Sequence, residues 1–199
     1  AKSNELISWL ESSLKTTLDA DSGLSLSQLK WHHTLRETEF YFPMEQVKPG
    51  QLGELLKQHR STRSSFQLPG YQSLQGMMHG FIDLIFQWQG RYYVADYKST
   101  HLGDELSCYD HISIEKNMRD NFYDLQYLLY SLALHRYLKF RIDDYDPQQH
   151  FGGVYYLYLR GMDMNSGQGV YYTEIKSDLL NTLDQLFSNQ LDKLMEKVG

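Results

Sequence analysis

The chain has 199 residues, of which 41% are hydrophobic and 22% charged, as expected of a globular protein with one hydrophobic core. The net charge of −6 argues against a general basic surface for nucleic acid, so any polyanion site must be local. A single cysteine, Cys108, excludes an internal disulfide, a CxxC zinc site and a four-cysteine iron–sulfur cluster. No apolar run is long enough to span a membrane, so we expect no membrane partner, and the single cysteine fits a reducing, intracellular setting such as the cytoplasm. Basic residues gather in two places, namely Lys57, His59, Arg60 and Arg63, and Arg136, Lys139 and Arg141.

Helical and strand-like patterns alternate along the chain. Apolar residues recur at helical spacing between Asn4 and Leu18, and alternation with aromatic residues before Pro43 is typical of a strand that the proline ends. Asp124 is expected to cap the longest helix. In chain order we predict helices over 4–18 and 25–33, a strand over 34–43, a helix over 49–60, a loop over 61–74, strands over 80–88 and 91–98, a loop over 100–110, helices over 111–121 and 124–140, strands over 152–161 and 169–175, and a helix over 177–195.

This order of elements predicts a mixed α/β protein in which helices pack on the faces of one sheet. Neither an internal repeat nor a low-complexity tract interrupts it. We therefore expect a single domain over 1–199, with a helical N-terminal part over 1–34 and the core over 35–199.

Two acidic residues interrupt the apolar strands of the predicted hairpin "GFIDLIFQWQGRYYVADYK". If Gln89 and Gly90 form a two-residue turn, Asp83 falls opposite Asp96, and both side chains point to the same face. Lys98 follows Asp96 by two residues and shares that face. The sequence therefore predicts a cluster of two carboxylates and one ammonium group.

Two carboxylates in a poorly hydrated place repel each other, so one takes a proton or a cation binds between them. Lys98 can supply that positive charge alone, in a purely structural network completed by an arginine. A divalent metal can do so more strongly, and Mg²⁺ is typically held by one or two carboxylates. The residues by themselves leave both interpretations open.

Three separate motifs are together similar to one family. The stretches "GFIDLIF…GRYYVADYKST", "YDLQYLLYSLALHRYL" and "HFGGVYYLYLRG" resemble the RecB-type nuclease domain, the C-terminal part of the helicase–nuclease subunit of RecBCD (exodeoxyribonuclease V) enzymes. This family belongs to the PD-(D/E)xK, or restriction-endonuclease-like, superfamily. The resemblance implies a central mixed β-sheet flanked by helices and a Mg²⁺-dependent DNA nuclease. It further implies action on DNA ends unwound by an associated helicase, in recombinational double-strand break repair.

The resemblance also implies roles for the hairpin residues. Asp83 and Asp96 match metal ligands, and the backbone carbonyl of Tyr97 would complete the same site. Lys98 matches the catalytic lysine, although orientation of the attacking water and stabilisation of the transition state are both open to it. The implied ion is Mg²⁺, and Mn²⁺ or Ca²⁺ could occupy the same place.

Three further positions match the family pattern. Gln126 and Tyr130 match a Q-x-x-x-Y motif that would position DNA, and their i, i+4 spacing puts them on one helix face. Glu37 matches an additional acidic position on the first strand. Without the resemblance, Gln126 and Tyr130 are most simply a packing face, and Glu37 is a solvated strand residue.

The chain departs from the family in lacking the histidine motif of an upstream helix, which favours an excised C-terminal fragment of a helicase–nuclease subunit. His79 is the one histidine that we would check as a substitute ligand. The implied partners are single-stranded DNA ends, RecC-like and RecD-like subunits in a heterotrimer, and the recombinase RecA. An alternative is a catalytically incomplete module that docks on such partners, which apolar helix faces left exposed within 104–121 or 177–195 would favour.

Overall fold

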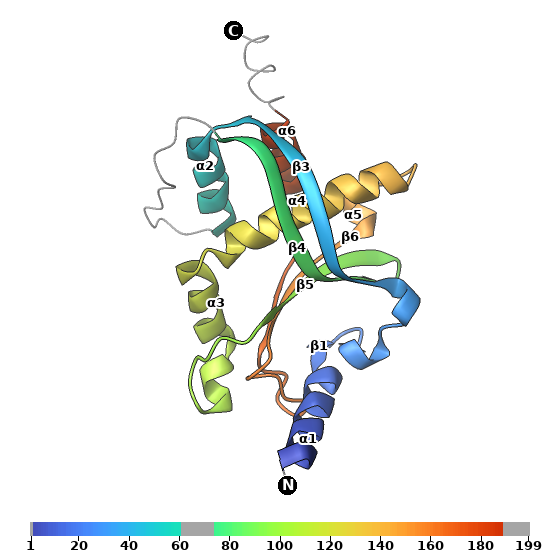
Figure 1. The fold of residues 1–199 in the computed structure, drawn as a ribbon, viewed down its shortest axis with the longest axis vertical. Helices are drawn as coiled ribbons and strands as arrows, with labels where there is room; N and C mark the ends of the chain where they lie inside the picture. The colour runs from blue at the N-terminus through green and yellow to red at the C-terminus, as the bar shows by residue number, and fades with distance from the viewer. Residues whose placement is uncertain (1, 61–73, 189–199) are drawn as a thin grey trace. The chain divides into compact units, whose positions relative to one another are not determined.

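The computed structural model describes residues 2–60 and 74–188 (Figure 1). A five-stranded mixed sheet has the order β3-β4-β5-β6-β7, and a separate two-stranded sheet pairs β1 with β2. This confirms the predicted α/β class with a central mixed sheet. The strands are β1 Thr17–Asp19, β2 Leu24–Ser25, β3 Thr34–Val47, β4 Leu74–Trp88, β5 Arg91–Lys98, β6 Phe151–Tyr158 and β7 Val170–Thr173. The helices are α1 Lys2–Lys15, α2 Pro49–Arg60, α3 His111–Asp120, α4 Tyr123–Arg141, α5 Pro147–His150 and α6 Ser177–Phe187, with 3-10 turns η1 Leu26–Gln28, η2 Trp31–His33 and η3 Leu106–Tyr109.

The β4–β5 hairpin has the predicted register. Gln89 and Gly90 have φ angles of 48° and 81°, as a tight two-residue turn with two left-handed positions requires. Glycine adopts this geometry without steric cost. The pairing runs from Trp88↔Arg91 to Leu84↔Ala95. The turn thus fixes which residues of the two strands share a face.

One compact unit contains 1–38, 82–123 and 152–174. Its core is formed by the hairpin, the tyrosine-rich strand β6 and the small β1–β2 sheet. Every residue of β6 is buried, as expected for an interior strand with both faces covered. The central cluster consists of Leu18, Leu24, Leu84, Phe86, Ala95, Tyr155, Leu157 and Met162.

The second compact unit contains 39–81, 124–151 and 175–199. Here α6 contacts α2 and α5, and it buries Leu180, Leu183 and Phe187 on one side. The Phe187 ring meets the edge of Phe42 from β3, with ring centroids 5.8 Å apart. None of the described helices is long and apolar enough to cross a membrane. The expectation of one domain over 1–199 stays a prediction.

Three expected boundaries were wrong. The strand that Pro43 was expected to end continues to Val47, because β3 lies at the edge of the sheet, where a missing N–H is tolerated. Asp124 does not cap α4 but lies inside its first turn, where Arg60 binds its carboxylate. The helix expected over 25–33 consists of the two short turns η1 and η2.

Other expectations differ from the structure only in extent. The first helix ends at Lys15, and the short strand β1 follows within the range expected to be helical. Strand β4 begins at Leu74, earlier than expected. The rest of the loop expected over 61–74, and the last predicted helical residues after Ser188, lie outside the described residues.

Candidate active site

The end of the β4–β5 hairpin brings together the three residues that the sequence singled out. Asp83 directly precedes Leu84, whose pairing with Ala95 is the last one away from the turn. The Oδ2 of Asp83 accepts a hydrogen bond from the backbone N–H of Tyr97 at 2.9 Å. The Nζ of Lys98 lies 2.7 Å from Oδ2 of Asp96. The predicted acid–acid–lysine cluster is therefore present, with Lys98 on the face of Asp96.

Burial controls the electrostatics of this cluster. Asp96 is only 4% exposed, and this burial raises the pKa of its carboxyl group above the ordinary value. The hydrogen bond and charge of Lys98 act in the opposite direction, and the nearby charge of Asp83 raises the pKa further. The ionised form of Asp96 is thus costly here unless a cation stands beside it, and Lys98 supplies one.

The donor set suits a hard divalent cation. Two carboxylates, one of them buried, provide the oxygen ligands that Mg²⁺ prefers, and Mg²⁺ takes water and substrate oxygens for its other positions. Within residues 2–60 and 74–188, no group of three or more His, Cys, Asp or Glu side chains forms a complete metal cage. The residues therefore fit an ion that shares its coordination with backbone, water and substrate. The Tyr97 carbonyl stays a predicted ligand.

Glu37 lies on β3 with its side chain exposed. Its φ angle of 46° is unusual for a residue other than glycine and marks a local distortion of the strand. Across the described part of the chain, no hydrogen bond or ion pair joins Glu37 to Asp83 or Asp96. Its role as an additional acidic site residue stays a prediction.

Gln126 and Tyr130 share one face of α4, as their spacing predicted. The Nε2 of Gln126 donates a hydrogen bond to the hydroxyl of Tyr130 at 2.9 Å. The Tyr130 ring packs edge-on against Phe40, with centroids 5.8 Å apart. The pair therefore has both a polar contact and a packing partner, and its function towards DNA stays a prediction.

His79 is held by neighbours on the β3–β4 ribbon. Its Nε2 lies 2.9 Å from Glu39, and its ring stacks on Tyr41 with a centroid distance of 4.5 Å. These contacts hold the His79 side chain in a local network within the second compact unit. They give no support to His79 as a substitute metal ligand.

Most of the described residues of the two basic clusters contact acidic or aromatic side chains. Arg60 is buried against Asp124, and His59 contacts the Tyr127 hydroxyl at 2.6 Å. Lys57 pairs with Glu54. In the second cluster, Arg136 and Lys139 both contact Asp184, at 2.7 and 3.4 Å. Apart from the Lys57–Glu54 pair, which lies within α2, these contacts join separate elements of the fold. Arg63 lies outside the described residues.

Sequence reasoning missed two tyrosines that contact Lys98. Its Nζ lies 3.9 Å from the ring centroid of Tyr123 and 5.0 Å from that of Tyr156. The only hint in the sequence was the abundance of tyrosine, with 16 residues in the chain. Abundance does not identify which rings meet the lysine, because Tyr123 and Tyr156 come from separate elements.

Comparison with known proteins identifies the family. The profile of the PD-(D/E)XK nuclease superfamily matches residues 12–198. Over 92% of its length, the chain is 42% identical to RecBCD enzyme subunit RecB of Escherichia coli K12 and 39% identical to the subunit of that name from Haemophilus influenzae. The corresponding subunit of Mycobacterium tuberculosis H37Rv is 36% identical over 72% of the chain. The chain spans 15–16% of the length of these relatives. The match along almost the whole sequence, together with the acid–acid–lysine cluster, places the chain in the PD-(D/E)XK nuclease superfamily.

Proposed function

We propose that the chain is a Mg²⁺-dependent deoxyribonuclease domain of the exodeoxyribonuclease V type, which hydrolyses phosphodiester bonds. The observation that carries this proposal is the buried Asp96 paired with Lys98 at 2.7 Å, with Asp83 beside it. A purely structural ion pair has no need of a second acid that raises the cost of ionising the first. A nuclease site needs both acids.

Each residue of the cluster has a distinct task in this proposal. Asp83, Asp96 and the Tyr97 carbonyl would hold Mg²⁺, with Mn²⁺ or Ca²⁺ able to occupy the same place. The bound ion would supply Lewis-acid activation of a phosphate oxygen and of a water molecule. The Lys98 side chain lies in a largely buried position beside Asp96, where its ammonium group could stabilise charge on the phosphate or orient the attacking water.

The names of the relatives support a biological setting. Because RecBCD enzyme subunits named RecB match most of this chain, we propose that it acts as a helicase-associated nuclease on DNA ends during recombinational repair. Its partners would be single-stranded DNA and RecC-like and RecD-like subunits. Within the same assembly, it would also contact RecA. Gln126 and Tyr130 would position the DNA strand. The cytoplasm is the expected location.

Cleavage of linear single-stranded DNA tests the proposal. The chain is assayed with Mg²⁺, with EDTA, and as the Asp96→Asn variant, which preserves the shape of the side chain while removing its charge. We expect Asp96→Asn to lower the cleavage rate by roughly 100-fold or more, as is typical when one preorganised electrostatic group is lost. Asp104→Asn is the matched control, because the Asp104 side chain is 94% exposed.

The outcomes separate the alternatives. Cleavage that requires both Mg²⁺ and Asp96 supports the nuclease, provided that circular dichroism shows the variant to be folded. Cleavage that survives in EDTA or in Asp96→Asn contradicts the proposed site. Absence of cleavage by a folded parent chain rejects activity of this chain by itself, and the same assay on a chain extended upstream then decides whether a missing ligand is responsible.

A second candidate is the protein-docking module, and one observation favours it. On α1, the side chains of Leu6, Ile7, Leu10 and Leu14 are each about half exposed. Of the two segments where such surface was expected, 104–121 exposes Leu106 and Ile112 while α3 buries Ile114 and Met118. The described helix α6 buries Leu180, Leu183, Leu186 and Phe187, and the rest of 177–195 lies outside the described residues. A folded chain that binds Mg²⁺ in calorimetry, and cleaves no DNA even when extended upstream, would give this function the lead.

A further inference from the structure

The ammonium group of Lys98 lies between a carboxylate and two aromatic rings. Besides the Asp96 contact at 2.7 Å, its Nζ lies 3.9 Å from the Tyr123 ring centroid and 5.0 Å from the Tyr156 ring centroid. Both ring distances fall within the range of cation–π attraction. The Lys98 side chain is only 12% exposed, so water screens these interactions little.

The two rings hold each other in place. Their centroids are 5.8 Å apart with an angle of 29° between the ring planes, and the Tyr156 hydroxyl donates to the backbone carbonyl of Tyr123 at 3.3 Å. Tyr156 lies in the fully buried strand β6, and Tyr123 is the first residue of α4. Phe122, just before α4, has a φ angle of 54°, a left-handed conformation that is uncommon for residues other than glycine. Both rings are thus held in place by the buried strand, by the start of α4 and by each other.

Contact with two fixed aromatic rings can define the position of a lysine ammonium group. This group sits on a flexible four-carbon stem and has no preferred plane of contact, so a single ion pair leaves the Nζ position loosely defined. A further carboxylate would fix it but would also neutralise its charge. The face of a tyrosine ring attracts the ammonium group without adding a formal charge, and so leaves that charge available to a phosphate.

We propose that Tyr123 and Tyr156 are positioning residues, forming an aromatic cage that holds the Lys98 ammonium beside Asp96 for the cleavage step. This inference rests on the proposed nuclease function. The tyrosines do not themselves touch the reacting atoms. They act through Lys98, so their loss affects turnover of bound DNA more than the binding of DNA.

Kinetics of paired variants test the cage. We expect Tyr123→Leu to lower kcat by about 10-fold with KM unchanged, which corresponds to the loss of one desolvated cation–π contact. Tyr123→Phe keeps the ring and should stay within about twofold of the parent chain. Tyr155→Leu is the matched control, because Tyr155 neighbours Tyr156 on β6 but packs at tilted angles against Phe86, Tyr93 and Tyr172 instead. It removes a buried ring on the opposite side of the strand without touching Lys98.

A spectroscopic readout separates geometry from activity. Protons near the face of an aromatic ring resonate upfield, so the ε-CH₂ signals of Lys98 should be shifted upfield in a ¹³C-lysine-labelled chain. Lys98→Arg assigns them by their disappearance. We expect the upfield shift in the parent chain and in Tyr123→Phe, and a return towards the ordinary position in Tyr123→Leu. Thermal unfolding checks that each variant is folded.

The outcomes distinguish failure of the cage from failure of the proposed function. A parent chain that cleaves DNA but whose Tyr123→Leu variant keeps its kcat, or whose Lys98 signals lie at ordinary positions, overturns the cage alone. A rise in KM at constant kcat assigns Tyr123 to DNA binding and likewise overturns the cage. A folded parent chain with shifted Lys98 signals and no cleavage, alone or extended upstream, overturns the nuclease function and with it the purpose of the cage.

Discussion

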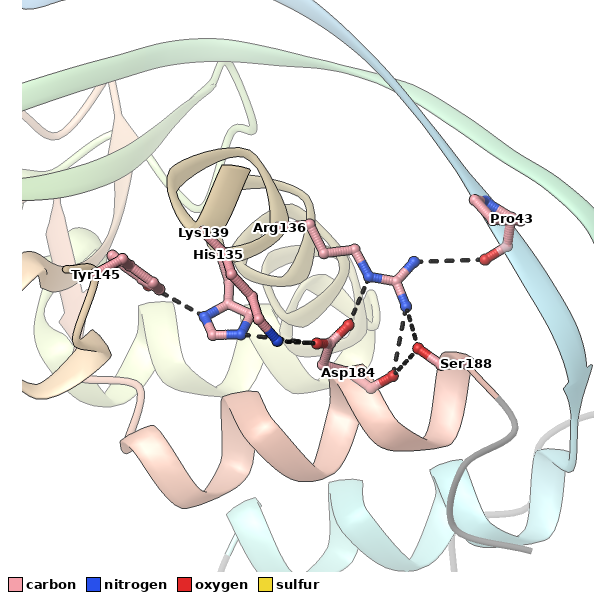
Figure 2. A network of polar contacts seen from close by, with 7 residues as sticks. All are labelled: Pro43, His135, Arg136, Lys139, Tyr145, Asp184 and Ser188. Carbon is pink, nitrogen blue, oxygen red and sulfur yellow. Dashed lines mark hydrogen bonds and ion pairs between the residues drawn. The ribbon is translucent and has the colours of Figure 1, made fainter. Parts of the chain in front are cut away.

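A single buried histidine shows how much one residue can couple stability to pH. Figure 2 shows His135 of α4 between Tyr145 and Asp184, with Arg136 and Lys139 on the same carboxylate. Its Nδ1 lies 3.1 Å from the Tyr145 hydroxyl, and its Nε2 is 4.0 Å from Asp184 Oδ2. Burial lowers the pKa of His135, although the charge of Asp184 works against this. The folded protein therefore holds His135 neutral in mildly acidic solution.

The consequence is a loss of stability on acidification. Below the ordinary histidine pKa of about 6.5, the unfolded chain binds a proton at His135 that the folded chain does not. The free energy of unfolding therefore decreases as the pH is lowered, by up to about 1.4 kcal/mol per pH unit for one such proton. This decrease ends when the pH reaches the lowered pKa of His135 in the folded state. We expect His135→Gln to make this decline shallower between pH 6.5 and 5, as measured by urea unfolding at several pH values.

Neighbouring groups set the limits of that experiment. Burial acts to raise the pKa of Asp184, but Arg136 and Lys139 outweigh it and keep this pKa below its ordinary value, so Asp184 stays ionised in the same range. The pKa of His59 is also lowered by burial, so part of the decline survives in His135→Gln. The exposed His33 provides the control substitution His33→Gln. An unchanged slope in His135→Gln would contradict the assignment.

At the scale of elements, a buried ion pair joins α2 to α4. The guanidinium group of Arg60, at the end of α2, binds both carboxylate oxygens of Asp124, with Nη2 2.8 Å from Oδ1. The two side chains are 8% and 4% exposed. Removing one partner of such a pair leaves an uncompensated charge in a place that water does not reach.

We therefore expect Asp124→Ala to lower the free energy of unfolding by about 3–5 kcal/mol in urea titrations. The double variant Arg60→Met/Asp124→Leu removes both charges and should recover most of that loss. The exposed Lys116–Asp120 pair on α3 is the control, since Asp120→Asn should change the free energy of unfolding by less than about 1 kcal/mol. Equal losses in the single and double variants would show that shape, not charge, matters at this contact.

The elements that sequence predicted well are those whose determinants are local. The β4–β5 register follows from the Gln89–Gly90 turn, and the proximity of Asp96 and Lys98 follows from strand alternation. Features that depend on residues distant in the sequence were not predicted. Pro43 is tolerated because β3 is an edge strand, and Asp124 meets Arg60 instead of capping α4. Tyr123 and Tyr156 are 33 residues apart in the sequence, so no local pattern predicts that their rings meet.

At the scale of the whole molecule, net charge opposes the proposed substrate. A chain of charge −6 repels a polyanion, and among the described residues of the two basic clusters, Arg60, His59, Arg136 and Lys139 already contact acidic or aromatic partners. DNA binding must then depend on few phosphate contacts. We expect a shallow dependence of log K on log[salt], with a slope of about −2 to −3 for single strands, equivalent to three or four contacts. Fluorescence anisotropy over a range of salt concentrations measures it.

The same balance of charge predicts how a divalent ion affects binding. In EDTA, Asp83 and Asp96 repel phosphate, so the parent chain should bind labelled single-stranded DNA weakly, and Ca²⁺ should tighten binding by about 10-fold as it offsets two negative charges. The double variant Asp83→Asn/Asp96→Asn should bind more tightly than the parent in EDTA and gain nothing from Ca²⁺. Asp104→Asn, with its exposed side chain, should behave as the parent does. If Ca²⁺ strengthens binding equally in the parent and the double variant, the ion acts elsewhere, and the two aspartates are not its ligands.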